Sequence, residues 1–236
     1  MPTSPVTRVD LFTVPLSAVP RAVGRMATDR QRLRRADPVF WKLLGTGDGR
    51  TFDARDADLR RWGVLTVWPT EDHAADFSTR HDVVGGWRRL ADEHWWALLR
   101  TLRVSGSWSR RQPFGASDGQ RATGPVAALT RARLRLSRAP RFWRSVAAVT
   151  AAFDRADGLR LRLGVGEAPL GLQGTFSLWD SPTAMQAFAY RAAPHRDVIR
   201  RSTSERWYAE ELFARFAVAH HGGTIFGADP LAGFRV

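Results

Sequence analysis

Short apolar runs alternate with amphipathic stretches along the 236-residue chain, and the same order of runs occurs twice. Apolar runs bounded by turn residues predict strands, whereas apolar positions three and four residues apart predict helices. Each half of the chain therefore has the predicted order β-α-β-β-α. The predicted strands are residues 9–14, 39–44, 63–68, 127–136, 159–165 and 175–179, and the predicted helices are residues 18–35, 71–80, 138–155, a helix that starts at Ser181-Pro182, and 207–216.

Capping residues support several of these boundaries. Ser17, Thr70 and Ser137 precede predicted helices, and their side-chain oxygens can accept hydrogen bonds from free backbone N–H groups. Ser181-Pro182 indicates a further helix start, with Ser181 as the cap and the proline in the first turn, where it is favoured. A second helical stretch is predicted after residue 80, to about Leu102. The glycines of Gly45-Thr46-Gly47-Asp48-Gly49 predict a turn-rich loop.

Individual residues repeat as well as the pattern, which predicts two similar structural units. Leu16-Ser17-Ala18-Val19-Pro20-Arg21 is echoed by Leu136-Ser137-Arg138-Ala139-Pro140-Arg141, and Leu44-Gly45-Thr46-Gly47 by Leu163-Gly164-Val165-Gly166. At a constant offset of 111 residues, a further set matches: Gly63, Trp68, Phe77, Arg80, Arg89 and Trp96 are echoed by Gly174, Trp179, Phe188, Arg191, Arg200 and Trp207.

A β-α-β-β-α unit is most of a ferredoxin-like fold, whose antiparallel sheet has one face covered by helices and one face bare. Two such units can pack sheet on sheet and cover both bare faces. We therefore predict an α+β fold in which two ferredoxin-like repeats form a pseudo-dimeric barrel within one chain. The predicted boundaries are residues 1–104 for the first repeat, 105–124 for a linker rich in Gly, Ser, Arg and Gln, and 125–236 for the second repeat.

Composition narrows the possible functions. The chain is 44% apolar and contains ten Trp, which is enough for a sizeable core, and no apolar run reaches the roughly 18 residues that a membrane span needs. The absence of Cys excludes disulfides, thiolate ligands and a Cys nucleophile. Since the N-terminus also lacks the pattern of a secretory signal, we expect a cytoplasmic protein.

The formal net charge is +13, and Lys42 is the only lysine among 36 basic residues. A basic surface can attract nucleic acid, anionic lipid or an acidic redox partner. No nucleic-acid-binding motif accompanies the Arg residues, so we expect no nucleic acid partner. Peripheral membrane contact and an acidic electron donor stay as candidate partners, and both a monomer and a homodimer stay open.

His195 is the strongest candidate for a metal ligand. Pro194 interrupts the last predicted helical region and marks a kink or a fresh helix start, which places His195 in a first turn. There the helix dipole favours the neutral imidazole that a metal requires. A single His suits haem, because the porphyrin supplies four nitrogens, and Arg191 and Arg196 could pair with the propionates. The first-half counterpart of His195 is Val84, which predicts one haem per chain; a His that only packs locally is the alternative.

Trp41 and Lys42 are further candidates for cofactor binding. Lys42 stands beside a Gly-rich strand end, where it could meet a carboxylate or a haem propionate, although a lysine that reaches into solvent is equally compatible with the pattern. His94 and His81 are rival ligands, and His220-His221 is predicted to lie in a loop. The pattern assigns no catalytic residue.

Several blocks of this sequence resemble the spheroidene monooxygenase family of carotenoid biosynthesis, and the match extends over nearly the whole chain, from about residue 9 to 231. The blocks are Phe40-Trp41-Lys42-Leu43-Leu44-Gly45-Thr46-Gly47, Gly106-Ser107-Trp108-Ser109 with Pro113-Phe114, Pro125 to Ala132, Phe142-Trp143, Leu163 to Pro169, Thr175 to Trp179, Ala187-Phe188, Pro194-His195, Trp207 to Phe216 and Gly227 to Leu231.

The resemblance implies an oxygenase that puts oxygen on an acyclic carotenoid, with haem as cofactor, dioxygen as oxidant and ferredoxin as electron donor. In that family, two hydroxylations at one carbon give a gem-diol that loses water to form a ketone. The chain also resembles, more distantly, haem proteins with paired ferredoxin-like barrels, in which an axial His follows the last strand of a unit, and His195 matches that place. A cofactor-free oxygenase or a small-molecule binder of the same fold is the alternative.

Overall fold

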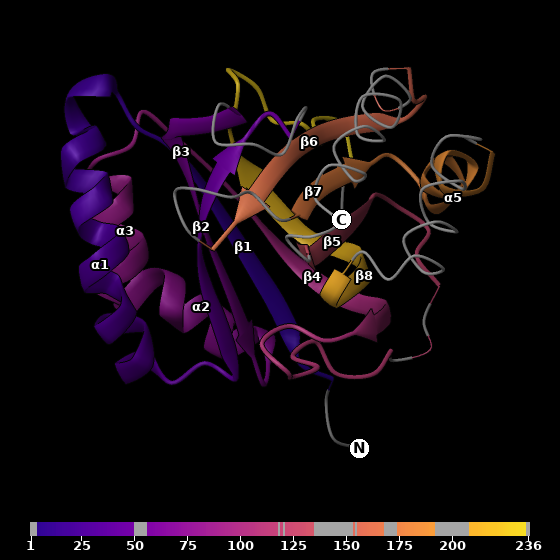
Figure 1. Cartoon of the computed structure of the whole chain (residues 1–236), viewed down its shortest axis with the longest axis horizontal. Helices are drawn as coiled ribbons and strands as arrows, with labels where there is room; N and C mark the ends of the chain where they lie inside the picture. Colours follow the sequence, from indigo (N-terminus) through magenta and orange to yellow (C-terminus); the bar gives the residue numbers. More distant parts are fainter. Residues whose placement is uncertain are drawn as a thin grey trace.

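Eight antiparallel strands close into a barrel in the order β1-β3-β2-β6-β7-β5-β8-β4, with helices on its outside (Figure 1). The computed structural model describes residues 4–49, 56–117, 119, 121–134, 153, 155–167, 174–191 and 208–234. The strands are β1 (Val6–Thr13), β2 (Phe40–Gly47), β3 (Ala57–Trp68), β4 (Glu93–Gly106), β5 (Val126–Leu134), β6 (Leu159–Gly166), β7 (Gly174–Trp179) and β8 (Tyr208–Gly223). The helices are η1 (Leu16–Ala18), α1 (Val19–Ala36), α2 (Glu71–Arg80), α3 (Asp82–Arg88) and α5 (Pro182–Arg191).

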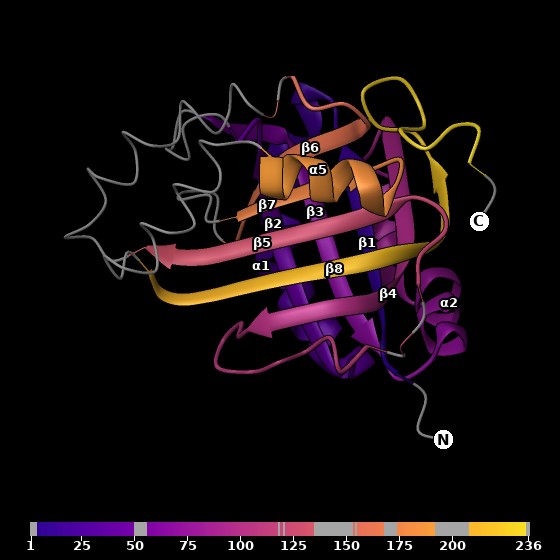
Figure 2. The ribbon, with the colours of Figure 1, turned by 90° about the vertical axis from the view of Figure 1, so that its right-hand side faces the viewer.

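The barrel consists of two sets of four strands with the same spatial order. The first set lies in the order β4-β1-β3-β2 and the second in the order β8-β5-β7-β6. The sets meet at two seams, where β2 pairs with β6 and β4 pairs with β8. The helices α1, α2 and α3 lie outside the first set, and α5 lies outside the second (Figures 1 and 2). The predicted α+β barrel is therefore confirmed.

The two Leu-Gly-x-Gly motifs face each other at the seam between β2 and β6. Gly45 pairs with Gly166, and Gly47 pairs with Gly164. The first glycine of each motif thus lies opposite the second glycine of the other, as in a contact between two like surfaces. The predicted loop that begins at Gly45 is wrong, because residues 45–47 continue β2 and pair across this seam.

The barrel interior is a packed core. Alternate residues of each strand point inward, and the interior holds large buried side chains such as Trp95 and Phe216. Trp108 and Phe114 also belong to this core, with exposed fractions of 1% and 0%. Both come from the segment predicted as a linker, so this part of residues 105–124 packs against the barrel.

The helix predicted over residues 207–216 is wrong, because residues 208–223 form the strand β8. The helical stretch predicted after residue 80 is confirmed only in α3 (Asp82–Arg88), because residues 93–106 form the strand β4. Along β8, Leu212, Ala214 and Phe216 point into the barrel, which is the period of two typical of a strand. The intervening Glu, Ala and Arg residues favour helix and obscure this period. Along β4 apolar side chains occupy both faces, so no alternation is visible. Each half therefore has a fourth strand beyond the predicted β-α-β-β-α.

Two of the predicted helix caps are confirmed. Thr70 Oγ1 accepts a hydrogen bond from the His73 N–H at 3.4 Å, and Ser181 Oγ accepts one from the Ala184 N–H at 3.1 Å. Ser17 does not cap α1, because it lies in η1 and the helix begins at Val19 without a side-chain cap. Ser137 and most of the helix predicted over residues 138–155 lie outside the described residues. None of the helices that the structure describes is long and apolar enough to cross a bilayer.

Candidate functional site

The structure describes the side chains of two of the five predicted cofactor-binding residues. His195 and Arg196 lie outside the described residues, and Arg191 ends α5 with a side chain that is not described. Trp41 and Lys42 are neighbours on β2, so their side chains point to opposite faces of the sheet. Trp41 packs against the apolar cluster under α1, whereas Lys42 reaches the barrel end, so these two residues do not share one site.

Lys42 belongs to a charged group at one end of the barrel, made by Lys42, Trp108, Arg131, Glu167 and Glu210, which we name the barrel-end cluster. Lys42 Nζ donates to Glu167 Oε2 at 2.5 Å. Glu167 Oε1 accepts from Trp108 Nε1 at 2.7 Å and from Arg131 Nη2 at 2.9 Å. Arg131, whose side chain is 4% exposed, also forms an ion pair with Glu210.

Both carboxyl groups of the barrel-end cluster have pKa values below their usual range. Burial raises the pKa of Glu167, but the hydrogen bonds from Lys42 and Trp108 and the charges of Lys42 and Arg131 together outweigh it. Burial also raises the pKa of Glu210. The hydrogen bond from the Arg110 N–H and the Arg131 guanidinium outweigh this effect, so the pKa is lowered overall. The cluster thus holds two positive and two negative charges at neutral pH, which suits it to fixing the barrel end rather than to transferring protons.

A second buried polar group lies outside the barrel, beneath the helices of the first half. Asp10 is fully buried and accepts two hydrogen bonds from Arg8, each at 2.8 Å, and Arg8 Cζ lies 4.8 Å from the centre of the Trp96 ring. Burial raises the pKa of Asp10, but the Arg8 charge and the His94 hydrogen bond lower it below the usual value. Arg8 and Asp10 interrupt an apolar strand two residues apart, and this is the signal in the sequence that could have revealed the pair.

The rival histidines are engaged in local contacts. His94 Nε2 lies 2.8 Å from Asp10 Oδ1, and His94 Nδ1 accepts from Arg88 Nε at 3.1 Å. With both ring nitrogens occupied, His94 is not free to bind iron. The His81 ring packs 5.3 Å from Phe77, and His220-His221 lies in β8 rather than in the predicted loop. Within the described ranges, no group of three His, Asp or Glu side chains could hold a metal ion.

The outer faces of the two strand sets differ in the size of their side chains. Strand pairing identifies equivalent positions in the two sets. Asp10 on β1 lies opposite Val64 on β3 and Trp96 on β4, and Thr130 on β5 lies opposite Thr175 on β7 and Phe213 on β8. Asp10 and Thr130 are therefore equivalent. The outer face of the first set carries mostly large residues, including Arg8, Phe12, Trp41, Trp62, Trp68 and Trp96. On the second set, the outward positions of β5 and β7 carry mainly small residues, namely Ala128, Thr130, Ala132, Thr175 and Ser177.

An aromatic cluster borders this small-residue face beneath α5. The ring centres of Phe153 and Phe188 are 4.2 Å apart, and those of Trp179 and Phe188 are 5.2 Å apart. The described part of α5 ends at Arg191, four residues before His195. A face of small side chains with an aromatic border suits a flat, apolar ligand.

The fold and this face define an α+β barrel with two four-stranded halves and one outer face of small side chains. Two solved structures of aldoxime dehydratase share the fold. One, in complex with butyraldoxime, has a TM-score of 0.63 and 9% identity, and the match covers 97% of this chain and 84% of that one. The other has a TM-score of 0.61 and 10% identity, covering 97% and 86%. At this identity the likeness concerns the fold alone.

Curated relatives give the family, although no family model matches the chain. The spheroidene monooxygenase of Rhodobacter capsulatus is 34% identical over 232 residues, which are 97% of this chain and 96% of the relative. That of Rubrivivax gelatinosus is 38% identical over 177 residues, 75% of this chain and 67% of the relative. That of Cereibacter sphaeroides is 34% identical over 193 residues, which are 81% of this chain and 59% of the relative. The chain thus spans less than two thirds of the length of this relative. The chain therefore belongs to the spheroidene monooxygenase family.

Proposed function

We propose that this protein is a monooxygenase that puts oxygen from O2 onto an apolar polyene such as an acyclic carotenoid. The observation that carries the proposal is the 34% identity to a spheroidene monooxygenase along 97% of the chain. Each hydroxylation would consume one O2, two electrons and two protons, and would yield one hydroxyl group and one water. A second hydroxylation at the same carbon would give a gem-diol, which loses water to form a ketone.

Haem is the cofactor that we propose, with His195 as its axial ligand. The donor set is compatible with this group: the chain has no Cys for a thiolate ligand, His195 can supply an imidazole, and the rival His94 is held by Asp10 and Arg88. The small-residue face of β5 and β7 fits it as well, because no bulky side chain projects from those positions. When bound, haem would supply the activation of dioxygen.

The residues of the second half would position cofactor and substrate. Arg191 and Arg196 flank the proposed ligand in the sequence and would pair with the propionates. The barrel interior is filled with its own side chains, so a long polyene would lie outside it. There the aromatic cluster of Phe153, Trp179 and Phe188 would contact the chain of the substrate and keep water from it.

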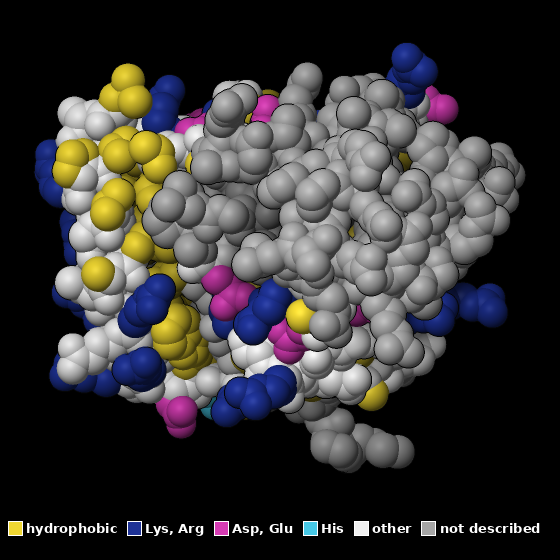
Figure 3. All heavy atoms as spheres, viewed as in Figure 1, with side chains coloured by type: hydrophobic (Ala, Val, Ile, Leu, Met, Phe, Trp, Pro, Cys, Tyr) yellow, Lys and Arg dark blue, Asp and Glu magenta, His cyan; other side chains and the backbone are white. Residues whose placement is uncertain are grey.

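A ferredoxin is the electron donor that we propose, and α1 is the basic surface that it would contact. Basic side chains, which on α1 are all Arg, line the edge of the molecule where Figure 1 places this helix (Figure 3). Arg30, Arg34 and Arg35 are exposed on this helix, where they would attract an acidic partner. Peripheral membrane contact would let an apolar substrate enter, and Leu16, 75% exposed beside α1, is a candidate contact.

We also propose that the two halves of the chain arose by internal duplication. Besides the common strand order, one hydrogen bond occurs in both halves at the offset of 111 residues. Trp68 Nε1 donates to Thr66 Oγ1 at 2.8 Å, and Trp179 Nε1 donates to Ser177 Oγ at 3.0 Å. The ligand-binding role would then belong to the second copy, because His195 has no histidine counterpart in the first.

The direct test is turnover with labelled oxygen. The full chain, reconstituted with hemin, would be incubated with a reduced ferredoxin, an acyclic carotenoid and 18O2, and the product analysed by mass spectrometry. We expect one labelled oxygen in a singly hydroxylated product, and one in a ketone, because the gem-diol loses its other oxygen as water. His195→Ala should abolish turnover, whereas His73→Ala, an exposed histidine on α2, should not. No oxygenated product would contradict the proposal, and turnover by hemin-free protein would support the cofactor-free alternative.

A further inference from the structure

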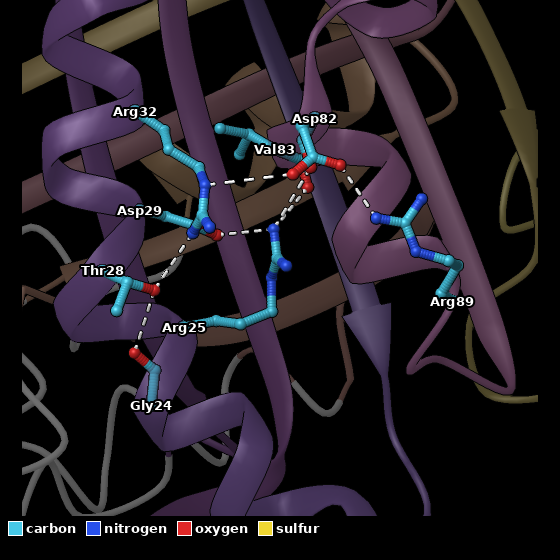
Figure 4. A network of polar contacts seen from close by, with 8 residues as sticks. All are labelled: Gly24, Arg25, Thr28, Asp29, Arg32, Asp82, Val83 and Arg89. Carbon is cyan, nitrogen blue, oxygen red and sulfur yellow. Dashed lines mark hydrogen bonds and ion pairs between the residues drawn. The ribbon is translucent and has the colours of Figure 1, made fainter.

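The helices α1 and α3 enclose a groove of about 490 Å³ whose walls carry four arginines. Arg21, Arg25 and Arg32 come from α1, at spacings of four and seven residues that place them on one helix face. Arg89 comes from the end of α3, on the opposite wall. The four arginines therefore line one groove from two elements of the first half, and Figure 4 shows Arg25, Arg32 and Arg89 among them.

The carboxylates in the groove neutralise only part of this charge. Buried Asp29 pairs with Arg25 at 2.9 Å and with Arg32 at 2.7 Å. Asp82 pairs with Arg89 at 2.8 Å and lies 3.9 Å from Arg32 Nε. Four positive charges thus face two negative charges, which leaves an excess of two positive charges in the groove.

Two of the arginines keep unused donors. Among the described residues, Arg21 has neither a hydrogen bond nor an ion pair, although it lines the groove. Arg25 Nη2 donates to the backbone oxygens of Asp82 and Val83, at 3.3 and 3.1 Å, which fixes its side chain across the groove. Arg25 Nε is buried and has no hydrogen-bond partner in the part of the chain that the structure describes. Fixed guanidinium donors without partners are typical of anion sites.

Two helical glycines make the room for this arrangement. A Cβ atom at Gly86 would lie 2.2 Å from Arg25 Nη1, so only glycine lets the Arg25 guanidinium lie against α3. A Cβ atom at Gly24 would meet no atom within 4 Å, so the space in front of Gly24 is open. Glycine in the middle of a helix is unfavourable by about 1 kcal/mol, and here its effect is to keep the groove accessible.

We propose that the groove between α1 and α3 binds a phosphate-bearing ligand through Arg21, Arg25 and Arg89. The planar guanidinium groups donate pairs of hydrogen bonds that match phosphate oxygens, and the excess of two charges suits a phosphomonoester or a diphosphate. The ligand would be either a free phosphate compound or the headgroup of an anionic phospholipid. This binding site goes beyond the proposed oxygenase chemistry, which does not require it.

Calorimetric titration of the full chain with inorganic pyrophosphate at low ionic strength tests the first source. We expect saturable binding at one site. Arg21→Gln should weaken it about tenfold, in line with the loss of a charge-assisted hydrogen bond. Arg30→Gln, which removes the same charge from α1 outside the groove, should change it by less than about twofold. Gly24→Leu keeps every arginine and fills the groove, so it should abolish binding.

Sedimentation with phosphatidylcholine vesicles, with and without phosphatidic acid, tests the second source. Binding that requires phosphatidic acid and follows the same order of variants would identify a lipid headgroup as the ligand, whereas binding of pyrophosphate alone would identify a free phosphate compound. Three results would overturn the proposal: neither probe binds, Arg30→Gln weakens binding as much as Arg21→Gln, or Gly24→Leu leaves binding unchanged. The last two would indicate attraction by the general surface charge.

Discussion

On the first half of the barrel, three helices pack onto an outer face that holds Trp62, Trp68 and the buried Arg8–Asp10 pair. On the second half, α5 lies outside a face where the positions that match Arg8 and Asp10 carry Ala128 and Thr130 (Figure 2). The strand order is the same in both. The two halves thus share a strand order and differ in the size of the side chains at several equivalent outer positions.

The difference separates stability from ligand binding. Large side chains between a sheet and its helices supply most of the burial that stabilises such a unit. A face of small side chains makes less of this contribution. Among the described residues the first half therefore carries the larger share of this packing, and the second half is where we propose that the cofactor binds.

The largest effect is expected at the buried ion pair. Asp10→Asn leaves the buried Arg8 without its carboxylate and should lower the free energy of unfolding by about 3–5 kcal/mol. The matched change in the second half, Thr130→Val, should cost less than about 1 kcal/mol. Urea unfolding measures both. Equal losses of unfolding free energy would contradict the proposed difference between the outer faces of the two halves.

Removing the equivalent indole hydrogen bonds should have equal effects in the two halves. Trp68→Phe and Trp179→Phe each lose one N–H donor to a hydroxyl group and some buried ring atoms, which together should cost about 1–3 kcal/mol. The two losses should agree within about 0.5 kcal/mol, because Trp68 and Trp179 also pack similarly, with ring centres 5.0 and 5.2 Å from Phe77 and Phe188. Thermal unfolding that shows a loss in only one half would argue against their equivalence.

The barrel-end cluster should make stability depend on pH. Because the pKa of Glu167 is lower in the folded protein than its ordinary value of 4.5, the carboxylate stabilises the fold above that pH and loses its effect as the pH falls below it. Glu167→Gln should therefore cost about 1 kcal/mol at neutral pH, a modest value because a third of the side chain is exposed, and less near pH 3. Glu211→Gln, at an exposed carboxylate on β8, is the control. A variant that loses as much stability at low pH as at neutral pH would contradict this role.

The smallest effect concerns the two glycines of the groove. Gly24→Ala should stabilise the protein by about 0.5–1 kcal/mol, since alanine favours helix and its methyl group meets no atom. Gly86→Ala should destabilise it, because the new methyl group displaces the Arg25 guanidinium from its backbone acceptors. Differential scanning calorimetry would show melting temperatures that move in opposite directions. A Gly86→Ala variant that melts at a higher temperature than the unaltered protein would mean that the position of the Arg25 guanidinium does not contribute to stability.

The sequence predicted the features that depend on local pattern. The positions of β3 and β7, the caps Thr70 and Ser181 and the barrel follow from repeats and periodicity. The strands β4 and β8 did not, because β4 is apolar on both faces and β8 is rich in helix-favouring residues. The separation of Trp41 from Lys42 could have been predicted, because both lie in the strand predicted over residues 39–44 and neighbours on a strand point to opposite faces.

The barrel-end cluster was beyond the reach of sequence patterns. Arg131 and Glu210 are 79 residues apart, and Lys42 and Glu167 are 125 apart, so no local spacing joins them. The pairing of β2 with β6 across the seam, and of β5 with β8 within the second half, brings these charges together. The one local signal is that Glu167 directly follows the second Leu-Gly-x-Gly motif.

Hemin binding tests most directly whether the second half holds the cofactor. Titration of the full chain with hemin, followed in the Soret region, should reach one equivalent per chain. His195→Ala should abolish the ligated spectrum, and Ala128→Trp, which fills the small-residue face, should weaken uptake, while His73→Ala should leave both unchanged. Hemin that binds to His195→Ala and Ala128→Trp with the affinity and spectrum of the unaltered chain would contradict the assignment of the cofactor to this half.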